Sequence, residues 1–155
     1  IENYSPSPFD QFIISIGAPE IRAKLYKYLT SKNYPLATII HPLAYVSKSA
    51  TISKGCIICP FAVVGFKSFI GSNVLMNTYS AVGHHVKVGD SCILSPKVLL
   101  AGKAEIEHEV FIGSGAIITP KKKVGSCARI AAGSVVYRNV KSNTTVIGNP
   151  AKNKF

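Results

Sequence analysis

The sequence predicts a mainly β fold in which short parallel strands wind around three faces, preceded by a short β-α-β segment. Three observations predict it: an unbroken six-residue repeat of aliphatic residues, small residues at a second fixed position of that repeat, and a differently patterned N-terminal stretch. At 155 residues with 47% hydrophobic content, the chain is long enough to bury a core. We expect an N-terminal unit at residues 1–42 and the coiled β domain, with a C-terminal tail, at residues 43–155.

The six-residue repeat is the strongest signal in the chain. Every sixth residue from Val46 to Val136 is aliphatic or Met. A period of six fits neither a helix, at 3.6, nor a simple strand, at 2, but it fits a short strand followed by a turn. Three such sides close a triangular coil of three hexads, and successive coils stack about 4.8 Å apart. We expect the aliphatic residues to point inward, each contributing about 1.5–3 kcal/mol by burial.

Small or β-branched residues recur four positions after each aliphatic residue, as at Ala62, Val86 and Ala116. We expect them to fill the corners of the prism, where space is tight. Gly often follows the aliphatic residue directly, as at Gly65 and Gly83. We expect Gly and Asn at the bends to relieve backbone strain.

The segment before the repeat has a different pattern. Residues 11–17 indicate a strand, Pro19 and Glu20 suit a helix start, residues 20–33 carry apolar residues at helical spacing, and residues 35–42 indicate a second strand. This unit is too short for a complete nucleotide-binding domain, and it lacks a Gly-rich phosphate-binding loop. Gly17 is the one candidate for contact with a substrate phosphate.

Composition narrows the classes of partner. The formal net charge is +11, with one dense run, Lys121–Lys123. No nucleic-acid-binding motif accompanies this charge, so anionic small molecules are the expected ligands. No apolar run approaches the roughly 20 residues of a membrane helix, and no signal peptide is evident, so we expect a cytoplasmic chain without membrane insertion.

Four cysteines, Cys56, Cys59, Cys92 and Cys127, include one C-x-x-C pair. The repeat points Cys56 inward and places Cys59 at a bend, so their side chains should diverge. A zinc site would need a second pair or histidines at ligand spacing, and none is present. We therefore expect reduced thiols and no metal.

The six-residue pattern resembles that of the hexapeptide-repeat acyltransferases, whose fold is a left-handed parallel β-helix. More narrowly, the chain resembles the sialic acid O-acetyltransferase and bacterial nucleotide-sugar N-acetyltransferase group. The resemblance covers residues 12 to 152 and includes a partial Rossmann-like N-terminal unit, "IIHP" at residues 39–42, "NTYSAVGHHVKVGD" at residues 77–90 and "GNPAK" at residues 148–152. It implies a homotrimer that moves acetyl from acetyl-CoA to an amine or hydroxyl of a nucleotide-linked sugar, in surface-glycan or sialic acid biosynthesis.

The resemblance assigns the general base to His84. In the repeat, His84 and His85 lie at a turn that projects from the prism, where a cleft between subunits would lie. An imidazole with a pKa near neutrality suits removal of a proton from the attacking amine. The family usually has Glu or Asp after the base, to orient and stabilise the imidazole. This chain has His85 there, which is expected to orient the His84 ring but, being neutral, not to stabilise the imidazolium. A carboxylate from elsewhere, including a neighbouring subunit, or a backbone carbonyl are the alternative partners. The chain also has Ile93 where some members have a second histidine.

The resemblance assigns further roles. Gly102, one full coil beyond His84, is expected to donate its backbone N–H to the thioester oxygen. Asn77 matches a polar residue near the acceptor. Residues for the acetyl-CoA groove are Gly102, Ser114, Gly115, Ala131, Ala132, Gly133 and Lys152, with Lys121–Lys123 as further phosphate contacts.

Two alternatives remain open at this point. A γ-type carbonic anhydrase shares the β-helix, but it needs two histidines five residues apart, and His84, His85 and His108 are separated by 1, 23 and 24. A catalytically weak or inactive homologue, acting as scaffold or regulator, is favoured by the missing carboxylate at position 85 and by Ile93.

Overall fold

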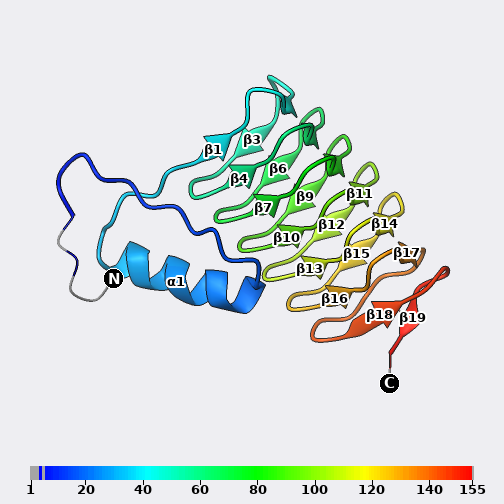
Figure 1. The fold of residues 1–155 in the computed structure, drawn as a ribbon. Helices are drawn as coiled ribbons and strands as arrows, with labels where there is room; N and C mark the ends of the chain where they lie inside the picture. The colour runs from blue at the N-terminus through cyan, green and yellow to red at the C-terminus, as the bar shows by residue number, and fades with distance from the viewer. Residues whose placement is uncertain (1–3, 5, 155) are drawn as a thin grey trace.

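The computed structural model describes residues 4 and 6–154, and it is a parallel β-helix with one α-helix, α1 (Pro19–Ser31), among those residues (Figure 1). Three walls of stacked strands form a prism. Wall 1 contains β1 (Ile39–Ile40), β4 (Ile57–Ile58), β7 (Leu75–Met76), β10 (Ile93–Leu94), β13 (Phe111–Ile112), β16 (Arg129–Ile130) and β18 (Thr145–Ile147), with β19 (Lys152–Asn153) added antiparallel. Wall 2 contains β2 (Tyr45–Val46), β5 (Val63–Val64), β8 (Ala81–Val82), β11 (Leu99–Leu100), β14 (Ile117–Ile118) and β17 (Val135–Val136). Wall 3 contains β3 (Thr51–Ile52), β6 (Phe69–Ile70), β9 (Lys87–Val88), β12 (Glu105–Ile106) and β15 (Lys123–Val124).

The observed register confirms the predicted repeat. From β1 to β17, paired strands are three hexads apart, as Ile39 is from Ile57, so one coil is three hexads. The last coil is shorter, since Arg129 pairs with Thr145. Each predicted inward aliphatic is the second residue of a strand, and all are buried except the half-buried Val46 and Ile52 of the first coil. The small corner residues are buried as well, from Cys56 onward. The core is therefore the single apolar column inside the prism.

Three edges join the walls, and we name them corner 1–2, corner 2–3 and corner 3–1 by the walls they connect. From Gly55 to Gly133, every sixth residue has a positive φ, as at Phe61 (60°), Lys67 (51°) and Asn73 (58°). Among the described residues, thirteen other than Gly adopt this conformation, Asn33 of the N-terminal unit included, and it costs about 1 kcal/mol or more for most side chains. The parallel stacking of coils enforces it at the corners.

The glycines that follow the inward aliphatics have a different purpose from the one expected. Gly65, Gly83 and Gly89 have no positive φ, so relief of backbone strain is the wrong explanation for them. A Cβ at residue 65 would lie 2.8 Å from the carbonyl carbon of Gly83, and one at residue 89 would lie 2.8 Å from that of Glu107. These glycines therefore allow the backbones of successive coils to approach closely.

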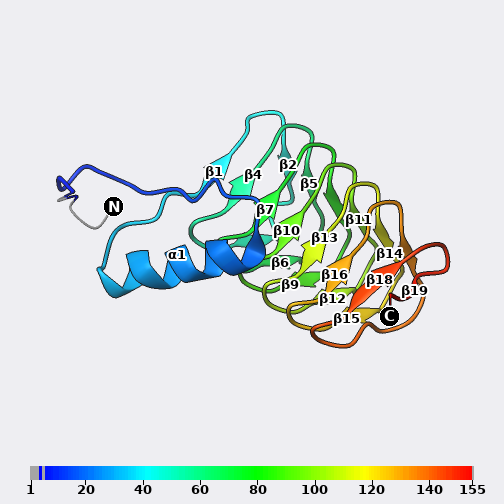
Figure 2. The same ribbon diagram turned by 60° about the horizontal axis from the view of Figure 1, so that its bottom comes forward.

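The N-terminal unit is more rudimentary than the predicted β-α-β. The two expected strands meet in one parallel bridge, Phe12 with Leu36. The segment expected as the second strand ends in β1, which pairs with β4 and so joins wall 1 before residue 43. Helix α1 is as predicted, and its first turns pack against the β-helix while its C-terminal end projects away (Figures 1 and 2). Buried Arg22 fixes it there by donating to the backbone and side-chain oxygens of Asn73 and to the carbonyl of Ile14.

The three walls differ on their outer surfaces. Wall 1 is partly covered by the N-terminal unit, and its Ile93 is only 3% exposed. Wall 3 carries mostly polar outward residues, such as Lys87, Glu105 and Lys123. Wall 2 is apolar on its outer surface along its whole length, with Tyr45, Val63, Ala81, Leu99, Ile117 and Val135 facing outward. No element of the described chain covers wall 2.

The C-terminal tail closes the last coil. The Val135 N–H donates to the Gly148 carbonyl, and the Ala151 N–H donates to the Val135 carbonyl. The tail thus supplies partners that a further coil would otherwise provide. In the described part of the chain, no helix has the length and apolar character needed to cross a membrane.

Candidate functional site

The two adjacent histidines lie on corner 2–3, exposed and directed away from the core, as predicted. They follow β8, and the backbone N–H of His85 donates to the carbonyl of Phe66 in the preceding coil. The Nδ1 atoms of His84 and His85 are 3.1 Å apart, and the two rings are nearly perpendicular, at 86°. The His85 and Phe66 rings also pack in a T-shaped arrangement, at 5.6 Å between centroids. The pair is therefore joined by one hydrogen bond and held on one side by an aromatic ring.

The imidazole of His84 lies directly against Gly102 of the next coil. A Cβ at residue 102 would overlap Nε2 of His84 and would lie 2.7 Å from its Cε1. The φ of Gly102 is not positive, so backbone conformation does not require glycine here. Close approach of the imidazole does require it. The predicted juxtaposition of His84 and Gly102, one coil apart on one edge, is present, and it is Nε2 of His84 that faces the glycine.

The backbone amide of Gly102 is available as a donor. The amides on either side of it are already hydrogen-bonded. The Ala101 N–H donates to the carbonyl of Ile118, and the Lys103 N–H donates to the carbonyl of His84. Within residues 4 and 6–154, no acceptor is found for the Gly102 N–H. An imidazole nitrogen and an unused amide therefore share one exposed corner, an arrangement suited to general-base catalysis beside a developing oxyanion.

Two lysines lie above the histidines on corner 2–3. Lys103 and Lys121 occupy the positive-φ position of corner 2–3 in the two coils above His85. Lys103 was not singled out from the sequence, although its position one coil after His85 is the signal that could have found it. The run Lys121–Lys123 does not act as one patch, because Lys123 lies on wall 3 with its Nζ 2.7 Å from the Glu107 carboxylate. That ion pair, together with Ser126, lowers the pKa of Glu107 to about 2.

Most of the other predicted site residues, all except Gly17 and Lys152, lie on corner 1–2, at the opposite margin of wall 2. Asn77 precedes β8, whereas His84 follows it, so the two lie at opposite ends of that strand. The Asn77 side chain accepts a hydrogen bond from the Thr78 N–H, at 2.8 Å. Ser114 and Ala132 are exposed on the same corner, and Ala131 is half-buried. Within one chain the structure does not bring these residues to His84, and an apolar wall separates the two groups.

Two glycines on corner 1–2 stand out. Gly115 and Gly133 have φ values of 69° and 68°, and a Cβ on either would meet nothing within 4 Å. Positive φ alone does not account for them, since Phe61 and Tyr79 adopt it on the same corner. No atom of the described chain excludes a side chain at these two positions. The result is a bare strip along the upper half of corner 1–2.

A cavity of about 280 Å³ lies at the C-terminal end of the β-helix, lined by Tyr137, Arg138, Pro150, Ala151 and Lys152. It places the predicted Lys152 beside Arg138, which was not predicted from the sequence. The two cations are 14 residues apart in the sequence, and the tail, whose backbone pairs with Val135 at the end of wall 2, brings them together. Two cations around one cavity suit a phosphate-bearing ligand.

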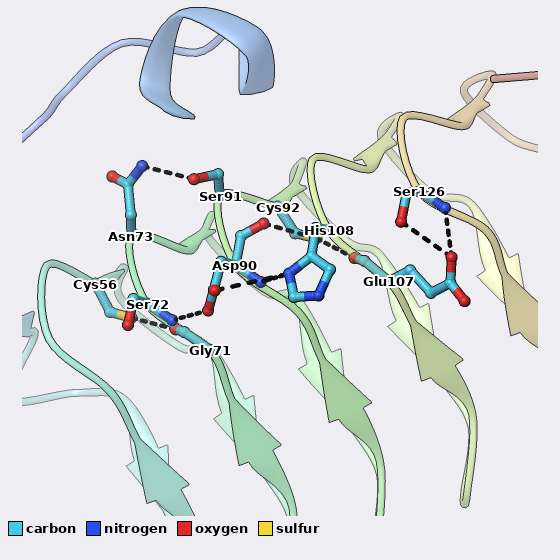
Figure 3. Close-up of polar contacts among 10 residues, drawn as sticks. All are labelled: Cys56, Gly71, Ser72, Asn73, Asp90, Ser91, Cys92, Glu107, His108 and Ser126. Atoms are coloured by element: carbon cyan, nitrogen blue, oxygen red, sulfur yellow. Dashed lines mark hydrogen bonds and ion pairs between the residues drawn. The ribbon is translucent and has the colours of Figure 1, made fainter. Parts of the chain in front are cut away.

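Corner 3–1 carries a separate polar ladder (Figure 3). The Asp90 carboxylate accepts the N–H of Ser72, and the Asp90 N–H donates to Nδ1 of His108 at 3.1 Å. His108 is thus on a different edge from His84, as its spacing predicts. Among the described residues, no group of three His, Cys, Asp or Glu side chains is placed to hold a metal ion.

The remaining residues that the sequence analysis discussed have no part in the two groups described above. Ile93 is buried under the N-terminal unit and offers no polar contact. Buried Cys56 donates its thiol to the Gly71 carbonyl, and burial raises its pKa to about 11. Cys59 is at a bend, so the C-x-x-C side chains diverge as expected. Gly17 is exposed just before α1, and a Cβ at that position would have no atom within 4 Å.

No protein-family model matches the chain. Among solved structures, PerB from Caulobacter crescentus in complex with CoA and GDP-perosamine superposes with a TM-score of 0.92 and 31% identity, over 94% of this chain and 70% of that one. The acetyltransferase domain of PglB from Neisseria gonorrhoeae gives a TM-score of 0.95 and 33% identity, over 99% of this chain and 75% of that one. The chain belongs to the hexapeptide-repeat, left-handed β-helix acetyltransferases.

Two curated relatives are matched over smaller shares of their own length. Serine acetyltransferase 4 of Arabidopsis thaliana is 31% identical over 117 residues, which are 73% of this chain and 28% of that protein. An acyl-[acyl-carrier-protein]–UDP-N-acetylglucosamine O-acyltransferase of Pseudomonas aeruginosa is 24% identical over 80% of this chain and 46% of its own length. The chain therefore spans between about a quarter and a half of the curated relatives it matches. Family membership confirms the predicted fold and the predicted resemblance.

Proposed function

We propose that this chain transfers acetyl from acetyl-CoA to an amino group of a nucleotide-linked sugar. The single observation that carries the proposal is the contact between Nε2 of His84 and Gly102, with Nδ1 of the same ring bonded to His85. The related PerB was solved with CoA and GDP-perosamine, and a second related structure is a mutant of the GDP-perosamine N-acetyl transferase of Caulobacter crescentus. The second name favours an amine over a hydroxyl acceptor. We also propose that the reaction belongs to surface-glycan or sialic acid biosynthesis, because the sequence resembles the acetyltransferases of those pathways.

The proposed chemistry is direct attack without an acyl-enzyme. The amine nitrogen attacks the thioester carbonyl carbon, and Nε2 of His84 accepts the proton that the nitrogen loses. For Nε2 to be bare, His84 must carry its proton on Nδ1 and donate it to Nδ1 of His85, whose own proton is then on Nε2. The Gly102 N–H donates to the carbonyl oxygen as its charge develops. The C–S bond then breaks, and the proton on His84 passes to the CoA sulfur.

Acetyl-CoA is proposed to lie along corner 1–2. The bare strip at Gly115 and Gly133, with exposed Ser114 and Ala132 and the adjoining Ala131, leaves room for the pantetheine arm. The cavity with Arg138 and Lys152 lies beyond β17, at the C-terminal end of wall 2, and its two cations suit the CoA phosphates. Lys121 lies on corner 2–3 in the same coil as Gly115, at the other end of β14. No metal enters this scheme.

The proposal requires neighbouring copies of the chain. His84 and the bare strip are on opposite margins of wall 2, whose outer surface is apolar and uncovered by the described chain. If wall 2 packs against a second copy in a closed ring, corner 1–2 of one copy meets corner 2–3 of the next. A homotrimer of this kind would complete three sites. Asn77 and Gly17 are then the proposed contacts for the acceptor's sugar and nucleotide.

The function is tested by release of CoA thiol from acetyl-CoA with a panel of GDP-, UDP- and dTDP-linked amino sugars. We expect turnover with at least one acceptor, and we expect His84→Ala to reduce kcat by about 100-fold or more. An inactive homologue, which the missing carboxylate at position 85 favours, would bind acetyl-CoA and turn over none of the acceptors. That result would refute the enzymatic proposal.

The CoA groove has its own test in Gly115→Lys. Lys97 precedes Gly115 by one coil on the same corner with the same sign of φ, at 61°, so the backbone accepts lysine there. We expect a folded protein whose dissociation constant for acetyl-CoA, measured calorimetrically, rises about tenfold or more, or by about 1.4 kcal/mol. Cys127→Lys, at the same repeat position on corner 3–1, is the matched control. Equal affinities in the two variants would place CoA elsewhere.

A further inference from the structure

The positive-φ residues of corner 1–2 form one column up the edge of the prism. In order they are Phe61, Tyr79, Lys97, Gly115 and Gly133. Consecutive members are linked through the backbone of adjacent coils, because the N–H groups of Tyr79, Lys97, Gly115 and Gly133 donate to the carbonyls of Pro60, Thr78, Pro96 and Ser114. The five positions of this column therefore lie one above another along one margin of wall 2.

This column changes character abruptly. Its upper members are glycines with open space around them, whereas its lower members are large and exposed: Tyr79 is 57% exposed and Phe61 is 46% exposed. The Tyr79 ring also stacks on the Phe61 ring, at 4.9 Å between centroids and 13° between planes. The bare strip thus ends in Lys97 and in a stacked aromatic pair.

The column changes from glycine to large side chains at the level of His84 and Gly102. Tyr79 and His84 flank the same strand, β8, and Lys97 and Gly102 flank the next one, β11. In a ring of copies joined through wall 2, equal levels of the two corners face each other. The side of the groove opposite His84 and Gly102 is therefore lined by Tyr79 and Lys97, whereas the glycine strip lies above them.

We infer that Lys97 and Tyr79 are the residues that restrict the acyl group to acetyl. This inference rests on the proposed function. Pantetheine lies over Gly115 and Gly133, and the thioester must stop beside His84. An acyl chain longer than acetyl would then have to occupy the space that the Lys97 and Tyr79 side chains fill. Extending the glycine strip downward by one or two coils should extend the acyl chain that the site accepts.

The test compares acetyl-CoA, propionyl-CoA and butyryl-CoA in the thiol-release assay with wild type, Lys97→Gly, Tyr79→Gly and the double variant. Glycine suits both positions, since their φ values are 61° and 59°. We expect the ratio of kcat/KM for butyryl-CoA to kcat/KM for acetyl-CoA to rise about tenfold or more in the double variant. This is the discrimination that a pocket typically shows for one or two methylene groups. Glu109→Gly, at the same repeat position on corner 3–1, is the control and should leave the ratio unchanged.

A double variant that keeps acetyl transfer while its butyryl-to-acetyl ratio stays at the wild-type value would overturn the inference. Failure of the proposed function looks different, because wild type would then turn over none of the three thioesters. In that event calorimetric binding of acetyl-CoA and butyryl-CoA decides the inference. A relative affinity for butyryl-CoA that is equal in wild type and the double variant would refute it, and a rise confined to the variant would support it.

Discussion

The hydrogen bond between the two histidines gives the sharpest prediction, because the chain itself shows which substitutions position 85 accepts. His85 has a φ of 56°. Glu109 adopts 58° and Phe61 adopts 60° at the same position of the repeat. His85→Glu and His85→Phe should therefore leave the backbone of corner 2–3 unchanged, so that any change in rate reflects the partner of His84.

The magnitudes follow from the 3.1 Å contact between the two Nδ1 atoms. Phenylalanine keeps a ring but removes the acceptor, and loss of one neutral hydrogen bond costs about 0.5–1.5 kcal/mol, or roughly 2- to 13-fold in kcat. Glutamate replaces a neutral acceptor with a charged one, and such bonds are roughly twice as strong. Because that charge also stabilises the imidazolium, we expect His85→Glu to raise kcat by about 3- to 10-fold.

The assay is steady-state thiol release with saturating acetyl-CoA, with KM for both substrates measured alongside kcat. A positioning role predicts that kcat moves in opposite directions in the two variants while both KM values stay nearly constant. Long-range nitrogen–proton NMR spectra would report His84 protonated on Nδ1 in wild type and in His85→Glu. Equal kcat values in all three proteins, or a His84 proton on Nε2 in wild type, would refute the assigned roles of the pair.

Three further outcomes are expected. Gly102→Ala should remain folded by circular dichroism yet lose about 100-fold in kcat/KM, because the new methyl displaces the His84 ring; retained activity would contradict the contact. Arg22→Met should destabilise α1 by at least about 2 kcal/mol, since it strands the buried acceptors of Asn73; hydrogen exchange confined to residues 19–31 checks this, and unchanged protection would refute it. Glu107→Gln should lower Tm at neutral pH, because a carboxylate whose pKa is depressed to about 2 stabilises the fold above its ordinary value of 4.5. That contribution disappears as the pH falls from 4.5 towards 2, so melting temperatures of variant and wild type should converge at pH 2, and a constant difference would exclude the ion pair as its source.

The sequence determined the register of the prism and therefore the exposure of its histidines. A period of six fits one strand and one turn per repeat, so Val82 was expected to point inward and His84 outward. The same arithmetic placed Gly102 one coil above His84, because equal corners recur once every three hexads. These predictions succeeded because each depends on local periodicity alone. The helix at residues 19–31 was likewise readable from its proline and its apolar spacing.

Other features depended on contacts between coils and could not be read from the period. Gly65 and Gly89 are required by backbone from the next coil, not by their own φ, and only stacked coordinates distinguish these causes. The expected strand at residues 11–17 is reduced to one bridge, since its neighbour at residues 39–40 pairs with wall 1 instead. Sequence spacing also could not reveal that Arg138 and Lys152 line one cavity.

The candidate site also has features that the sequence predicts and features that only the packing of coils decides. The sequence by itself determined which residues face outward on each edge, because outward direction is a property of position within a hexad. Only the tertiary structure decided that His84 is bonded to His85 through their Nδ1 atoms, and that Asn77 and Gly115 lie across an apolar wall from both. Ring orientation and the separation of edges depend on packing between coils distant in the chain, and such packing leaves no periodic signal in the sequence.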